Sequence, residues 1–152
     1  MKTLTYKPMR REDLAFVNRV RNLDETRHFL RDTRVITMSE TLQWFEEYRP
    51  LWLIVYADDD KVAYVRLSHD TGETICIGCD VKPEMRRMGI ASSVYKTLIS
   101  EFYESGYRLV WLEVFDDNTN AITLYKKLGF KQTNQYLWGD RKAYIMVHSN
   151  ER

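Results

Sequence analysis

Apolar residues recur along the chain with two periods, and each period predicts one kind of element. Leu14, Val17 and Val20 recur every three residues, which places them on one face of a helix. Short apolar runs bounded by turn residues predict strands instead. The predicted helices cover Glu12–Asn22, Thr37–Tyr48, Gly89–Ser105 and Thr119–Leu128. The predicted strands cover Thr3–Lys7, Trp52–Ala57, Val62–Ser68, Thr74–Val81, Leu109–Val114, Phe130–Gln135 and Lys142–His148.

Residues with special backbone preferences set the boundaries of these elements. Thr37 and Glu40 have the spacing of a capping box at the start of the second helix, and Pro50 follows its end. The order β-α-α-β-β-β-α-β-α-β-β predicts an α/β (α+β) fold, in which helices cover a mixed sheet. The turns expected between strands lie at Asp58–Lys61, at Asp70–Gly72 and near Gly139.

The length and charge of the chain bound its class. With 152 residues and no internal repeat or linker, the sequence predicts one domain over 1–152. The 23 basic and 22 acidic residues give a net charge of +1, which argues against a dedicated nucleic-acid binder. Met1–Met9 lacks the apolar run of a signal peptide, and no apolar stretch approaches the ~18 residues of a membrane helix. We therefore expect a cytoplasmic protein without a nucleic-acid or membrane partner.

Cys76 and Cys79 form a C-x-x-C pair, which raises the question of a zinc or redox site. One such pair supplies half of a structural zinc site, and no second pair or histidine cluster completes it. Both residues lie in a predicted strand, where residues three apart point to opposite faces. We interpret them as two ordinary buried thiols and expect no metal.

The first chemical signal lies between Val81 and Ala91. A strand ends there, a loop with two arginines follows, and a turn at Gly89 opens a helix. The unpaired N–H groups and positive dipole end of a helix N-terminus attract anions, and glycine lets a phosphate approach the backbone closely. From these residues alone, two interpretations stay open: a diphosphate site, or a glycine that merely permits a tight turn.

A second motif downstream gives this loop a context. Arg86-x-x-Gly89-x-Ala91 and Asn118-x-x-Ala121-x-x-Leu124-Tyr125-x-x-x-Gly129-Phe130 together resemble the two cofactor motifs of the GNAT superfamily of acetyl-CoA-dependent N-acetyltransferases. The resemblance covers about Thr74–Phe130, and the order of elements extends it to nearly the whole chain. It implies a mostly antiparallel central sheet of about seven strands, splayed at the cofactor site and flanked by about four helices.

The resemblance also implies a role for each matching residue. Backbone groups of the strand before the loop would pair with the pantetheine arm of acetyl-CoA, and the loop amides would hold its pyrophosphate. Asn118 would bind the pantetheine arm, and Tyr125 would protonate the departing thiolate. Met88 departs from the family pattern of a glycine or small polar residue, but only its backbone is needed. The strand residues are Ile77, Cys79 and Val81, and the loop residues are Arg86, Arg87, Met88, Gly89, Ile90 and Ala91.

Tyr125 also has a chemical case of its own. A phenol with a pKa near 10 stays protonated at neutral pH and can donate to a thiolate whose thiol has a pKa near 8.5. The alternative is a core tyrosine beside Leu124 and Leu128.

The attacking amine must lose a proton, and the sequence offers three carboxylates as the base. At pH 7 this loss costs about 4.6 kcal/mol for a lysine-like amine but only about 1 kcal/mol for an α-amine. Glu113 is the preferred base, because family members that acetylate protein N-termini often carry its Leu-Glu-Val context. Glu73, Asp80 and a water relay remain alternatives, and Glu113 could equally be an exposed strand carboxylate.

The acceptor is the least defined part of the prediction. Arg21, Arg27 and Trp44 belong to a pattern that resembles GNAT enzymes acting on nucleotide-linked amino-sugars, where arginine grips phosphate and aromatic rings stack on sugars. The arginines could instead be solvated, and Trp44 could be core. The alternatives are a peptide N-terminus as acceptor, a non-catalytic CoA-binding module and a transferase acting on charged tRNA. The predicted partner is a small-molecule amine or a peptide N-terminus, and the chain would be a monomer or homodimer.

Overall fold

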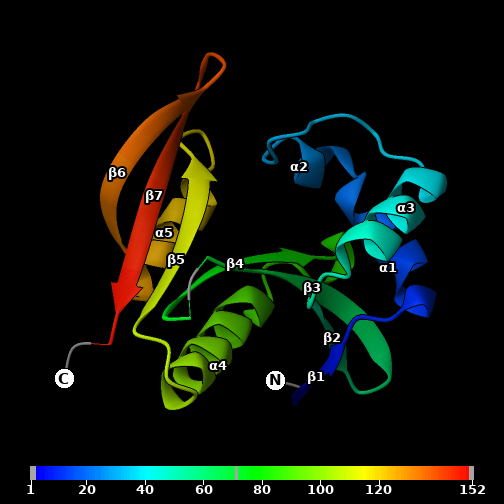
Figure 1. The fold of residues 1–152 in the computed structure, drawn as a ribbon, viewed down its shortest axis with the longest axis horizontal. Coiled ribbons are helices and arrows are strands. Elements are labelled where there is room, and N and C mark those ends of the chain that lie inside the picture. The colour runs from blue at the N-terminus through cyan, green and yellow to red at the C-terminus, as the bar shows by residue number, and fades with distance from the viewer. Residues whose placement is uncertain (1–2, 71, 151–152) are drawn as a thin grey trace. The chain divides into compact units, whose positions relative to one another are not determined.

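The computed structural model describes residues 3–70 and 72–150 (Figure 1). Its strands are β1 Leu4–Pro8, β2 Leu53–Ala57, β3 Asp60–His69, β4 Thr74–Val81, β5 Leu109–Phe115, β6 Lys131–Trp138 and β7 Arg141–Ser149. Its α-helices are α1 Leu14–Arg21, α2 Asp24–Arg27, α3 Met38–Tyr48, α4 Ile90–Glu104 and α5 Thr119–Lys127, with 3₁₀ turns at Arg11–Asp13 and Pro83–Met85. Among the described residues, no helix is both long and apolar enough to cross a membrane.

The strands form one seven-stranded sheet in the order β1-β2-β3-β4-β5-β7-β6. β4 pairs with β5 in parallel, through Thr74–Cys76 and Leu109–Trp111. The pairs β1–β2, β2–β3, β5–β7 and β6–β7 are antiparallel. The predicted fold class, a mixed and mostly antiparallel sheet of about seven strands flanked by helices, is confirmed.

The chain divides into two compact units. The first unit comprises the residues up to Leu67 together with Gly78–Ala91, and the second comprises Ser68–Ile77 and the residues from Ser92 onward. The divisions therefore fall within β3, within β4 and in the first turn of α4. The 82–89 loop, between β4 and α4, belongs to the first unit, and α5 belongs to the second.

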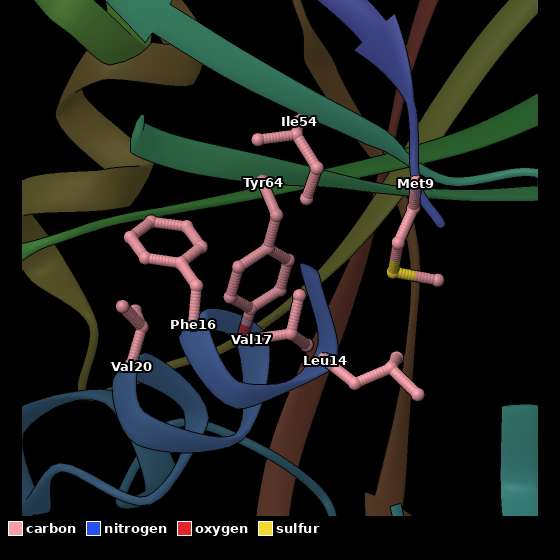
Figure 2. Packing of buried hydrophobic residues seen from close by; sticks show 7 residues of the cluster. All are labelled: Met9, Leu14, Phe16, Val17, Val20, Ile54 and Tyr64. Atoms are coloured by element: carbon pink, nitrogen blue, oxygen red, sulfur yellow. The ribbon is translucent and has the colours of Figure 1, made fainter. Parts of the chain in front are cut away.

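The core of the first unit forms between α1 and the sheet. Phe16 and Val17 of α1 lie beside Tyr64 of β3, which is fully buried (Figure 2). The helical spacing seen in the sequence therefore corresponds to a buried face, as predicted. The cluster consists of Met9, Leu14, Phe16, Val17, Val20, Ile54 and Tyr64.

The second unit is built on the antiparallel strands β5, β7 and β6. Leu112 of β5 lies opposite Met146 of β7, and both side chains are buried. Tyr95 of α4 and Phe130, which precedes β6, are also buried and meet edge to face, with ring centroids 6.4 Å apart. Tyr125 of α5 packs against both of these rings.

The predicted elements agree with the structure apart from local differences. The capping box of α3 is present, with Thr37 Oγ1 accepting from Glu40 N at 3.1 Å and Thr37 N donating to the Glu40 carboxylate at 3.2 Å. The predicted helix over Glu12–Asn22 begins instead as a 3₁₀ turn, and the short helix α2 was not predicted. The turn expected at Asp70–Gly72 includes Thr71, which lies outside the described residues.

Candidate active site

The 82–89 loop has the backbone geometry of an anion-binding segment. Arg87 and Gly89 have φ of 62° and 79°, so two left-handed residues flank Met88 just before α4 begins. Alternating backbone conformations of this kind turn successive N–H groups towards a common concavity. Within the described residues, the amides of Arg87, Met88 and Gly89 donate no hydrogen bond to the protein. These N–H groups are therefore available to a ligand.

The start of α4 adds to this anion site. α4 runs for 15 residues from Ile90, and its first N–H groups have no partner inside the helix. A helix of this length presents about half a positive charge at its N-terminus. Met88 is 55% exposed, so it is not part of the core. The loop and the start of α4 thus form a candidate anion site.

The Arg86 side chain turns into the first unit. Its Nε donates to the Val81 carbonyl at 3.0 Å, and its Nη2 donates to Thr26 Oγ1 at 2.8 Å. Arg86 therefore ties the loop to the end of β4 and to α2, while its backbone contributes to the loop.

Successive side chains of β4, the strand before the loop, point to opposite faces of the sheet. Ile77 and Val81 are buried, and burial, together with the charge of Asp80, raises the pKa of the Cys79 thiol to about 12. Cys76 and Cys79 are both free, and a thiol with so high a pKa is unreactive at neutral pH. Among the described residues, no group of three or more histidine, cysteine or acidic side chains could hold a metal ion.

The opposite face of β4 carries an ion pair. Arg66 Nε lies 3.1 Å from Asp80 Oδ2, and a Cβ at Gly78 would lie 2.6 Å from the Arg66 guanidinium carbon. Glycine thus lets Arg66 cross the strand to reach Asp80. Burial, reinforced by the charge of Asp80, raises the pKa of Tyr64 well above its ordinary value. Asp80, one of the alternative bases, thus forms an ion pair with Arg66.

Glu73, the other alternative base, lies at the far end of β4. It immediately precedes Thr74, the first residue of the strand. Its carboxylate is mostly exposed and lies 3.9 Å from Arg108. Glu73 is therefore an exposed carboxylate beside an arginine.

Glu113 lies in the middle of β5 and is half-buried. Tyr136 of β6 donates its hydroxyl proton to Glu113 Oε2 at 2.7 Å. The carboxylate is thus oriented by a neighbour from the C-terminal hairpin.

α5 positions Asn118 and Tyr125, the two residues of the second motif with predicted chemical roles. Asn118 is its N-cap residue, but its side chain does not cap the helix, which leaves the amide for another partner. Tyr125 is half-buried, and its hydroxyl oxygen lies 3.3 Å from that of Tyr95. The Tyr125 ring also meets Phe130 edge to face, with centroids 5.9 Å apart.

The residues predicted to bind the acceptor have structural contacts. Arg21 donates to the carbonyls of Asp32, at 2.6 Å, and of Arg34. Arg27 donates to the Thr33 carbonyl at 2.8 Å and pairs with Asp24. Both therefore brace the 28–36 segment, which joins α2 to α3. Trp44 packs on Trp52, with ring centroids 4.7 Å apart, at the edge of the first unit's core.

Three contacts at these sites were not foreseen from sequence: Thr26 with Arg86, Arg66 with Asp80, and Tyr136 with Glu113. Only the second had a signal, because a glycine inside a strand marks a close approach, and Gly78 stands where Arg66 crosses.

Comparison with known proteins decides the family. The model of the acetyltransferase (GNAT) family matches residues 17–130 of the chain. The chain belongs to the acetyltransferase (GNAT) family. The predicted superfamily is therefore confirmed.

Two curated GNAT relatives come from Salmonella typhimurium. The first is a ribosomal protein bS18-alanine N-acetyltransferase, 33% identical over 84 residues, which are 55% of this chain and 57% of that protein. The second is the peptidyl-lysine N-acetyltransferase YjaB, 29% identical over 115 residues, or 76% of this chain and 73% of YjaB. The chain thus spans little more than half of the first relative.

Solved GNAT structures share the fold. The spermidine N-acetyltransferase of Vibrio cholerae, in complex with CoA and spermine, superposes with a TM-score of 0.88. The match covers 96% of this chain and 95% of that one at 16% identity, which speaks for the fold alone.

Proposed function

We propose that this chain uses acetyl-CoA to acetylate the α-amino group of a peptide or protein N-terminus. The observation that carries the choice of acceptor is the engagement of Arg21 and Arg27 with the 28–36 segment. A nucleotide-linked sugar requires cations for its diphosphate beside the amine. A peptide α-amine requires none, so the bracing role of the two arginines favours it over the amino-sugar.

The chemistry of the candidate base agrees with an α-amine. Glu113 accepts a hydrogen bond from Tyr136, and Asp80 is paired with Arg66. An α-amine costs only about 1 kcal/mol to neutralise at pH 7, against about 4.6 kcal/mol for a lysine side chain. A carboxylate that already accepts a hydrogen bond, assisted by water, is therefore a sufficient base for an α-amine.

One of the two relatives supports the same acceptor. The alanine N-acetyltransferase acts, by its name, on a ribosomal protein. The Leu112-Glu113-Val114 context is the feature that suggested this acceptor from sequence. YjaB, by its name, acts on peptidyl-lysine, so a lysine acceptor is the outcome to test against.

In the proposed reaction, bound acetyl-CoA supplies an activated acyl group. The amides of Arg86–Ala91 would bind its pyrophosphate, and Asn118 and the backbone of Ile77–Val81 would bind its pantetheine arm. The amine nitrogen would bond to the acetyl carbonyl carbon, and Glu113 would accept the proton that the amine loses, directly or through water. Tyr125 would donate its phenolic proton to sulfur as the carbon–sulfur bond breaks. The proposal treats 1–152 as one acetyltransferase domain.

The test is a thiol-release assay with matched acceptors. One peptide containing a single lysine is offered with a free or a blocked N-terminus, alongside UDP- and dTDP-linked amino-sugars. We expect kcat/KM for the free N-terminus to exceed that of the blocked peptide by at least ~10-fold, given the difference of about 2.6 pH units between the two amine pKa values. Preference for the blocked peptide or for the sugars would overturn the proposed acceptor. Acetyl-CoA binding without turnover of any amine would indicate a non-catalytic module.

A further inference from the structure

A single side chain links the 82–89 loop to a helix far away in the sequence. Arg86 Nη2 donates to Thr26 Oγ1 at 2.8 Å, a contact across 60 positions of the chain, and Arg86 Nε donates to the Val81 carbonyl at 3.0 Å. The guanidinium is planar, so two bonds from one fork fix its orientation. Arg86 is thereby held between the end of β4 and α2.

Thr26 is itself firmly placed. It is 5% exposed, and its backbone N–H donates to the Leu23 carbonyl at 2.9 Å in the first turn of α2. The next residue, Arg27, donates to the carbonyls of Asn22 and Thr33. The hydroxyl that accepts from Arg86 is therefore part of a braced segment rather than a mobile surface group.

The loop needs such support because its backbone is strained. Arg87 has φ of 62°, in the left-handed region that non-glycine residues occupy at a cost. Such conformations persist only where the surroundings over-determine them. The backbone bonds Met85 N to Lys82 O and Arg86 N to Pro83 O hold the first half of the loop. Within the described residues, no comparable bond is donated by the amides of Arg87 to Gly89.

We propose that Thr26 is a positioning residue for acetyl-CoA binding. Acting through the Arg86 guanidinium, it holds the amides of Arg87, Met88 and Gly89 in the conformation that receives the pyrophosphate. This inference rests on the cofactor role proposed for the loop, and Thr26 touches neither the cofactor nor the acceptor. By reciprocity, acetyl-CoA binding stabilises α2 through the same bond.

The contrasting interpretation is that the Thr26 hydroxyl serves stability alone. Thr26→Val removes a buried hydroxyl and so lowers the melting temperature under both interpretations. If the hydroxyl serves stability alone, the affinity for acetyl-CoA would stay unchanged. Thr41 of α3 provides a matched control, because it is 7% exposed and its hydroxyl is also hydrogen-bonded, to Asn18 and to the Thr37 carbonyl. Its hydroxyl has no bond to the 82–89 loop among the contacts described.

The experiment is calorimetric titration of acetyl-CoA into wild type, Thr26→Val, Thr26→Ser and Thr41→Val. We expect Thr26→Val to raise Kd about tenfold, since a hydrogen bond to a charged donor is lost, while kcat at saturating acetyl-CoA stays within about twofold. Thr26→Ser keeps the hydroxyl and should restore affinity. Thr41→Val should lose thermal stability and bind as wild type does.

Two further readouts complete the test. In an Arg86→Met background, Thr26→Val should weaken binding no further, because their effects share one bond. Acetyl-CoA should slow amide exchange in α2 of wild type more than in Thr26→Val.

Equal Kd for wild type and Thr26→Val, or an equal loss of affinity in Thr41→Val, would overturn the inference. If Thr26→Val does not fold, Thr26→Ala against Thr26→Ser makes the same comparison. Failure of wild type to bind acetyl-CoA would instead refute the proposed function.

Discussion

Tyr125 and Tyr95 place their hydroxyl oxygens 3.3 Å apart, with rings meeting edge to face at 5.4 Å. Either oxygen can be the donor, so Tyr95 can accept or donate this hydrogen bond. Tyr95 is buried, whereas Tyr125 is half-buried and so retains access to a ligand. At the scale of residues, Tyr125 is thus the candidate acid, and the buried Tyr95 is the neighbour that holds its hydroxyl.

Removal of the Tyr125 hydroxyl tests this division. Tyr125→Phe should lower kcat by ~10²-fold or more while acetyl-CoA affinity stays within a few fold, because general acid catalysis acts on the chemical step. Steady-state kinetics and calorimetry measure the two quantities. Tyr95→Phe is the control and should lower kcat by less than ~10-fold. Unchanged turnover in Tyr125→Phe would mean that the residue only packs.

At the scale of elements, β3 and β4 share a face that is shaped by a missing side chain. Gly78 leaves room for Arg66 to cross β4 and reach Asp80, whose side chain is 12% exposed. A carboxylate this buried depends on its partner, since burial of an unpaired charge is costly. The ion pair therefore stabilises the strand that precedes the 82–89 loop.

Gly78→Ala should break this arrangement. The new methyl group would lie 2.6 Å from the Arg66 guanidinium carbon, so the guanidinium must shift and its contact with Asp80 weakens. We expect the free energy of unfolding to fall by about 1–2 kcal/mol, less than for a fully buried pair because Arg66 is 39% exposed. Urea denaturation measures the change. Gly72→Ala, which meets nothing within 4 Å, should stay within about 0.5 kcal/mol, and equal effects would contradict the account.

Local patterns in the sequence were enough to predict most elements. β4 spans Thr74–Val81 as expected, because a short apolar run stood between turn residues. α2 was missed because four residues with one buried side chain show no helical period. The loop at Arg86–Ala91 was found through its motif, but the Arg86–Thr26 bond joins residues 60 positions apart and leaves no local pattern.

At the scale of the whole molecule, the candidate site draws residues from the stretch that matches the family and from the chain beyond it. Residues 17–130 contain both stretches that resemble cofactor motifs, together with Glu113 and Tyr125. Tyr136, which orients Glu113, comes from β6 and lies beyond the matched stretch. The C-terminal hairpin thus supplies a contact to the candidate base that family membership alone would not reveal.

The central claim is that the 82–89 loop and the start of α4 bind acetyl-CoA, and Gly89 tests it most directly. Gly89 has φ of 79°, and an aspartate there would add both strain and a negative charge beside a diphosphate. Gly139→Asp is a matched control, because Gly139 has a similar φ of 64° and open space around it.

The measurement is calorimetric titration of acetyl-CoA into wild type, Gly89→Asp and Gly139→Asp, each checked for folding by circular dichroism. We predict micromolar or tighter binding to wild type and Gly139→Asp, and at least ~100-fold weaker binding to a folded Gly89→Asp, as the loss of several charge-assisted bonds implies. Equal affinity in wild type and Gly89→Asp would contradict the account.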